Sequence, residues 1–233
     1  MRSHQLLLFF LICFSLSNDF AYAKAQACEH VSSRLPELEL IDDENEIIYD
    51  FTLGTKDLKK LQKQARLIIT GDTYGLTSGV YKYQLFIMPD FKRLSSMSNK
   101  YCPGISKIFI RFMYESTIYV AKEFNHGSCS FRTILDHEMQ HHEINVTNKK
   151  KYLKWLKSDL QSIAGAIISQ YKPVKGNNMQ SVFNDIQTDL KDAIDVYIHK
   201  MHVDTKIANQ RLDSVSEYLR IGRQLKRCNN AKK

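Results

Sequence analysis

The segment "HEMQH" at residues 137–141 constrains the fold of this chain more than any other stretch of the sequence. Its two histidines are four residues apart, so on an α-helix they share one face and both imidazoles can reach a single cation. Glu138 then lies beside that cation, where its carboxylate can take a proton from a bound water. We therefore predict a helix that carries a zinc site, with His137 and His141 as metal ligands and Glu138 as the catalytic base.

The residues around the motif indicate which way the histidines face. Ile134 and Ile144 continue the stripe of His137 and His141 at spacings of three, four and three residues, which is typical of the buried face of a helix. His142 and Glu143 lie off that stripe, and we expect both to be outer or surface groups. Histidines that are only hydrogen-bonded, without a metal, remain the alternative.

A catalytic zinc normally keeps three protein ligands and one open position, so a third ligand must come from elsewhere in the chain. We favour Asp204, because it interrupts the apolar stripe of the last long helical segment, and a buried carboxylate needs a partner or a cation. The alternatives left open are Asp159, His202 and His199.

The N-terminus has the features of a secretory signal peptide. Arg2 precedes the apolar run "LLLFFLICFSL", and the small residues of "AYA" end at Ala23. Residues 1–23 are therefore predicted to be removed on export, to the periplasm or the outside of the cell, and no later segment predicts stable membrane insertion. The net charge of +8 is spread along the chain. We interpret the basic run at 148–157 as a solvated helix face rather than a nucleic-acid site.

Four of the five cysteines lie beyond the predicted signal peptide. An even number of cysteines in an exported protein favours disulfides, and four cysteines allow three pairings. Because Cys102 and Cys129 flank one strand-like region, we predict that they pair with each other. Cys28 and Cys228 would then form the second bond.

The pattern along the chain predicts an α+β fold in one domain over residues 46–233, after an exposed lead-in at 24–45. A small, mainly antiparallel sheet with one helix should come first, followed by the metal-site helix and two long helices. The predicted strands are 46–53, 75–88 and two within 106–124 around a turn at Glu115–Ser116. The first predicted helix begins near Thr55. The later predicted helices cover about 130–145, 148–170 and 180–226, with a break at 171–178.

Several segments resemble a bacterial family of unknown function described as predicted secreted zinc-dependent proteases. They are "YDFTLGTKDLKKL", "TYGLTSGVYKYQLFI", a cysteine ahead of the strand pair, and "HEMQHHEI". The resemblance covers about residues 46–212 and implies a zincin-like fold with a zinc cofactor. The sequence departs from the family pattern at Val203, where the family has tyrosine, and at Asn209, near a family histidine.

These features together favour a zinc-dependent metallopeptidase that hydrolyses peptide bonds by Glu-assisted attack of a zinc-bound water on a protein or peptide substrate. The main alternative is an exported zinc-binding or interaction protein without hydrolytic activity. Glu138 favours hydrolysis, because a site that only binds metal has no use for a glutamate between its ligands. The segment 117–124 either pairs with an extended substrate or is an ordinary inner strand.

Overall fold

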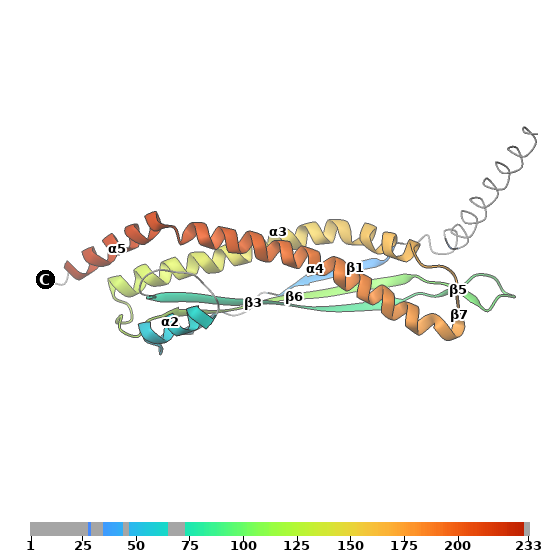
Figure 1. The fold of residues 1–233 in the computed structure, drawn as a ribbon, viewed down its shortest axis with the longest axis horizontal. Coiled ribbons are helices and arrows are strands. Elements are labelled where there is room, and N and C mark those ends of the chain that lie inside the picture. Colours follow the sequence, from blue (N-terminus) through green and yellow to red (C-terminus); the bar gives the residue numbers. More distant parts are fainter. Residues whose placement is uncertain (1–27, 29–34, 44–46, 65–72, 231–233) are drawn as a thin grey trace, which may run out of the picture. The chain divides into compact units, whose positions relative to one another are not determined.

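The computed structural model describes residue 28 and residues 35–43, 47–64 and 73–230 (Figure 1). The predicted signal peptide lies outside the described residues. Helices and strands are both present, so the prediction of a mixed α and β fold is confirmed. The elements are β1 (Glu37–Asp42), β2 (Ile47–Asp50), α2 (Thr55–Gln64), β3 (Gly75–Pro89), β4 (Lys92–Arg93), β5 (Lys100–Cys102), β6 (Ile105–Val120), α3 (Cys129–Ser169), β7 (Val174–Lys175), the 3-10 helix η1 (Gly176–Asn178), α4 (Met179–Leu212) and α5 (Val215–Asn230).

The described chain divides into two compact units, and β3, β6, α3 and α4 each contribute to both. The first unit contains the three-stranded sheet β4-β5-β7, in which both pairs are antiparallel. Its buried core includes apolar residues of β6, α3 and α4, namely Ile105, Ile108, Ile110, Leu160, Ile186, Leu190 and Ile194. Between α3 and α4, residues 171–178 form β7 and η1, which confirms the predicted helix break.

The second unit comprises residues 41–84, 111–155 and 196–233 and contains the whole of the predicted metal motif. In this unit β2 pairs in parallel with the end of β6, from Ile47 opposite Ser116 to Asp50 opposite Tyr119. The N–H of Ala121 donates to the carbonyl of Tyr74, just before β3 begins. Residues 117–120 therefore belong to an inner strand, so the second interpretation of segment 117–124 is the one observed.

β6 is a single strand of 16 residues, and the prediction of two strands around a turn at Glu115–Ser116 is wrong (Figure 1). The two polar residues occupy opposite faces of the continuous strand. Ser116 is buried, and its hydroxyl lies 3.0 Å from Nδ1 of His142. Glu115 lies on the outer face and forms an ion pair with Lys82. Each polar side chain has a tertiary partner, so neither interrupts the alternation of the strand.

α3 is likewise one continuous helix, and the predicted break near residues 145–148 is wrong (Figure 1). Ser128 caps its start, since the hydroxyl accepts the N–H of Phe131. At the expected break, the side-chain amide of Asn145 donates to the carbonyl of His141, and the hydroxyl of Tyr81 donates to the Asn145 carbonyl. These bonds hold asparagine, a poor helix former, inside the helix.

Both predicted disulfide pairings are wrong. The structure pairs Cys28 with Cys102 in the first unit and Cys129 with Cys228 in the second. The prediction was based only on Cys102 and Cys129 flanking one strand-like region. That region is the unbroken 16-residue strand β6, which separates the two cysteines. In the observed pairing, the second disulfide ties α5 to the first residue of α3.

The described residues of the predicted lead-in also contribute to the fold. Residues 37–42 form β1, which pairs with β6, and Arg111 forms an ion pair with Asp43 just beyond it. Lys149, from the basic run that we interpreted as solvated, is only 3% exposed. It forms an ion pair with Asp42 and donates to the carbonyl of Asp43. None of the described helices is long and apolar enough to span a membrane.

We predict that Lys149→Ala lowers the free energy of unfolding by about 2–4 kcal/mol, because it leaves the Asp42 carboxylate without its cation in a largely buried place. Urea unfolding followed by circular dichroism measures this change. The matched control is Lys150→Ala, on the exposed side of the same turn, with an expected effect within about 0.5 kcal/mol. Equal stability of the two variants would contradict a structural role for the buried lysine.

Candidate metal centre

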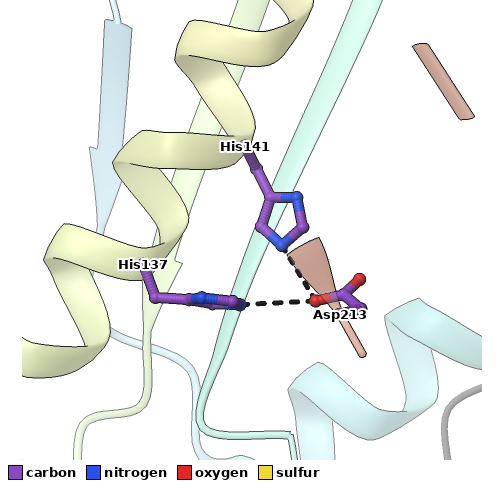
Figure 2. A group of neighbouring side chains, drawn as sticks. All are labelled: His137, His141 and Asp213. Carbon is purple, nitrogen blue, oxygen red and sulfur yellow. Dashed lines mark hydrogen bonds and ion pairs between the residues drawn. The ribbon is translucent and has the colours of Figure 1, made fainter. Parts of the chain in front are cut away.

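Three side chains of the second unit converge on one point. His137 and His141 extend from one face of α3 toward the carboxylate of Asp213 (Figure 2). The Oδ1 atom of Asp213 lies 3.3 Å from Nε2 of His137 and 3.0 Å from Nε2 of His141. The ligand atoms all lie within 4.8 Å of one another, so this group can hold a metal ion. The structure thus brings together the two predicted histidine ligands and adds a third residue.

Asp213 occupies the place that we predicted for Asp204. Our prediction continued the apolar stripe of the last helix past Met201 by three residues, which leads to Asp204. The structure continues instead in steps of four, because the buried residue after Met201 is Thr205, and Asn209 and Asp213 follow toward the histidines. Steps of three and of four both keep to one face of a helix, so the sequence alone allowed either.

Asp204 itself is engaged elsewhere. Its carboxylate accepts the hydroxyl proton of Tyr152 at 2.7 Å and lies 3.2 Å from the ammonium of Lys151, and its side chain is 43% exposed. The hydrogen bonds from these two residues hold the pKa of Asp204 below its usual value. An exposed carboxylate with two donors needs no cation, which removes the reason for choosing it.

The other candidates also lie outside the metal-binding group. Asp159 belongs to the first unit and accepts a hydrogen bond from Ser158. His202 packs edge-on against the ring of Tyr81, and His199 is exposed. His142 bonds Ser116 and Glu143 is exposed, as expected for outer and surface groups.

A helix boundary places Asp213 at the site. α4 ends at Leu212, and Ser214 caps α5, since its hydroxyl accepts the N–H of Glu217. "SVSE" at residues 214–217 therefore has the Ser-x-x-Glu spacing of a capping box, a signal for a helix start that our prediction of one continuous helix over 180–226 missed. With that signal, Asp213 would have stood out as a carboxylate between two helices.

A chain of amide groups fixes the orientation of His141. The side-chain N–H of Asn209 faces Oδ1 of Asn145 at 3.5 Å, so the Oδ1 of Asn209 points to Nδ1 of His141 at 2.9 Å. Nδ1 therefore carries the proton, which leaves Nε2 as the atom that faces Asp213 and could bind a metal. This is the usual outer-shell arrangement of a metal-binding histidine. In His137, by contrast, Nδ1 is buried without a hydrogen-bond partner among the described residues.

Glu138 is 5% exposed and packs against the start of β3. The hydroxyl of Thr77 lies 2.9 Å from both Oε2 and the main-chain oxygen of Glu138. A Cβ atom added at Gly75 would lie 2.6 Å from Oε1, so only glycine at this position leaves room for the carboxylate. Burial raises the pKa of Glu138, opposed by the charges of His141 and His137. A carboxylate with a raised pKa suits a general base near neutral pH.

The charges of the cluster are strongly coupled. Burial alone would lower the pKa of His141, but the hydrogen bond to Asp213 and the charges of Glu138 and Asp213 raise it to about 9. Burial would raise the pKa of Asp213, but hydrogen bonds from His137 and His141 lower it to about 2. Without a metal, the cluster is therefore held together by an imidazolium and a carboxylate.

The residue types of the group suit a divalent metal ion. The two separations from Asp213 Oδ1, 3.3 Å and 3.0 Å, are hydrogen-bond distances of the metal-free cluster. All three ligand atoms lie within 4.8 Å of one another. Two imidazoles and one carboxylate form a ligand set that leaves a fourth position open. The chemistry of these ligands does not by itself distinguish zinc from other divalent transition metals.

A cavity of about 240 Å³ opens onto the cluster. Its polar wall includes His137, Glu138, His141 and Asp213, and the hydroxyl-bearing side chain of Tyr218 also lines it. Burial, with the charges of Asp213 and Glu138, raises the pKa of Tyr218 to about 12, so its hydroxyl keeps its proton at neutral pH. The cavity therefore brings the carboxyl group of Glu138 and the hydroxyl of Tyr218 to one space.

No protein-family model, curated protein or solved structure matches this chain. The resemblance to the predicted secreted proteases therefore stays a prediction, and the residues of the metal centre are the support for a function.

We predict that Asp213→Ala weakens zinc binding by about 100-fold or more, because it removes a ligand, whereas loss of an outer-shell group costs 10–100-fold. Titration with zinc against a chelating dye measures the affinity. Asp204→Ala is the matched control and should bind zinc as the native chain does. The assignment of Asp213 fails if Asp213→Ala keeps the native zinc affinity and Asp204→Ala loses it.

The metal-free protein should lose stability between about pH 6.5 and pH 9. His141 has a pKa of about 9 in the fold against an ordinary value of 6.5. Its pairing with Asp213 thus stabilises fully below pH 6.5, and this contribution is lost as the pH rises through 9. The expected loss is on the order of 2–3 kcal/mol, measured by urea unfolding with a chelator present. Asp213→Asn should flatten this dependence, and an equally steep dependence in that variant would refute the coupling.

Proposed function

We propose that this protein is an exported, zinc-dependent metallopeptidase. The observation that carries the proposal is the position of Glu138. It directly follows the first histidine of the metal-binding group and lines the same cavity as His137, His141 and Asp213. A buried carboxylate whose pKa is raised by burial and which lines a cavity is a candidate catalytic group, and hydrolysis gives it a role.

His137, His141 and Asp213 would hold the zinc ion, which would supply a Lewis acid that acidifies a water and polarises the substrate carbonyl. Glu138 takes one proton from the water as its oxygen bonds to the carbonyl carbon. The same carboxyl group then gives that proton to the leaving nitrogen as the carbon–nitrogen bond breaks. One water is consumed, and the products are a carboxylic acid and an amine.

Other residues of the chain support this role. Thr77 and the space at Gly75 hold the carboxyl group of Glu138 against β3. The protonated hydroxyl of Tyr218 can donate to the carbonyl oxygen as negative charge develops on it. Asn209 keeps Nε2 of His141 directed at the metal position.

The substrate is proposed to be an extended peptide. Gly75, Leu76 and Thr77 of β3 line the cavity, and among the described strands β3 pairs only with β6. Its other edge can therefore accept the backbone hydrogen bonds of a peptide strand. Two disulfides suit an oxidising compartment such as the periplasm or the outside of the cell.

Glu138→Gln is expected to keep zinc affinity within a few-fold and to lower peptide hydrolysis by about 10²–10⁴-fold, since it removes the base and leaves the ligands. Residues 24–233, produced under oxidising conditions and loaded with zinc, would be tested against a peptide library with products read by mass spectrometry.

The control for this test is Glu143→Gln, which changes an exposed glutamate on the same helix and should leave the rate unchanged. Stoichiometric zinc with no cleavage by the native chain would favour the alternative of an exported metal-binding protein. Cleavage that survives Glu138→Gln would refute the assigned base.

A further inference from the structure

The cavity at the metal centre changes in character along α3. Ile134 lines it one turn before His137, and Asn145 lines it one turn after His141. These two residues lie roughly 16 Å apart along the helix axis. The cavity therefore runs from an apolar end, past the metal-binding group and Glu138, to an end lined by the amides of Asn145 and Asn209.

α5 supplies the opposite wall of the apolar end. Ile221, Gly222 and Leu225 line the cavity from this helix, while Tyr74 and Leu76 line it from residues at the start of β3 and just before it. Leu225 packs against the buried cluster that contains Ile134, so the apolar wall is continuous with the core. The disulfide between Cys129 and Cys228 holds this helix to the start of α3.

Gly222 lies in the wall of this end of the cavity. Glycine within a helix is less favourable than alanine. A Cβ atom added at Gly222 would meet nothing within 4 Å, which means that packing against a neighbour does not require glycine here. Any larger side chain at this position would instead occupy space at the cavity wall.

From this geometry we infer that the apolar end of the cavity is a specificity pocket for one large apolar side chain next to the scissile bond. The substrate class is thus peptides with leucine, phenylalanine or a similar residue at that position. This inference rests on the proposed function. The whole cavity measures about 240 Å³, and the side chains of Ile134, Ile221 and Leu225 give this end its apolar lining.

The expected preference for large apolar residues comes from their burial. Transfer of a large apolar side chain from water into an apolar pocket is favourable. A pocket of this type discriminates by about 10–200-fold against a side chain that is too small. Serine or aspartate should be disfavoured further, because Ile134, Ile221 and Leu225 offer their polar groups no hydrogen-bond partner.

The test uses peptides of the form acetyl-Ala-Ala-Xaa-Ala-Ala-amide, with leucine, phenylalanine, alanine, serine or aspartate as Xaa. Hydrolysis by the zinc-loaded native chain gives kcat/KM and the cleavage position. Calorimetric binding to the zinc-loaded Glu138→Gln variant gives affinity without turnover. We expect leucine or phenylalanine to exceed alanine by at least 10-fold in both measurements.

Gly222→Phe and Gly222→Leu should fill the pocket and remove at least 10-fold of the preference for the large side chains. The alanine peptide should be affected little. Gly222→Ala should largely keep the preference, and Arg223→Phe, on the exposed face of the same helix, is the control for a bulky aromatic that does not enter the cavity. Circular dichroism and zinc content establish that each variant is folded and loaded, and Gly222→Leu serves if the phenylalanine variant does not fold.

The two proposals fail in different ways. Cleavage without a preference for large apolar residues, or a preference unchanged by both bulky substitutions, overturns the pocket and leaves the peptidase proposal intact. Binding of leucine and phenylalanine peptides that depends on Gly222, without cleavage by the native chain, supports the pocket and overturns the peptidase proposal. Absence of both binding and cleavage overturns the pocket as well.

Discussion

The contact of one carboxylate oxygen with two imidazoles organises the second compact unit. Oδ1 of Asp213 lies 3.3 Å from Nε2 of His137 and 3.0 Å from Nε2 of His141, and so fixes the junction of α4 and α5 against the N-terminal part of α3. The cavity depends on this junction, since Tyr218 and Ile221 follow it directly on α5. A carboxylate between two histidines is stable without a metal, and the same three side chains could hold a metal ion. The same contact can therefore shape the protein before metal arrives and bind the metal afterwards.

The metal motif was predictable because its information is local. Two histidines four residues apart define one helical face, and the apolar residues on both sides of them indicate that this face is buried. His137, Glu138 and His141 accordingly share one cavity in the structure. Asp213 was not predictable by the same reasoning, because helical periodicity allows steps of three and four, and the choice between Asp204 and Asp213 depends on tertiary packing. The capping-box pattern after Asp213 was the available signal.

The wrong predictions about the fold have a common physical cause. Polar residues within apolar or helical runs were interpreted as turns, breaks or solvated faces, although each of them bonds to a residue that is distant in the sequence. Ser116 meets His142, Asn145 meets Tyr81, and Lys149 meets Asp42. Local propensity is overruled when a buried polar group finds such a partner, and a single sequence does not reveal that partner. The wrong disulfide pairing has another origin, because it was chosen only from the two cysteines that flank one strand-like region.

His137, His141 and Asp213 are proposed to bind a single zinc ion. X-ray absorption at the zinc edge of the oxidised native chain tests this claim most directly. The predicted result is one zinc per chain with only nitrogen and oxygen neighbours at about 2.0–2.2 Å, two of the neighbours being imidazoles. Sulfur neighbours at about 2.3 Å, fewer than two imidazoles, or zinc well below one ion per chain would contradict it.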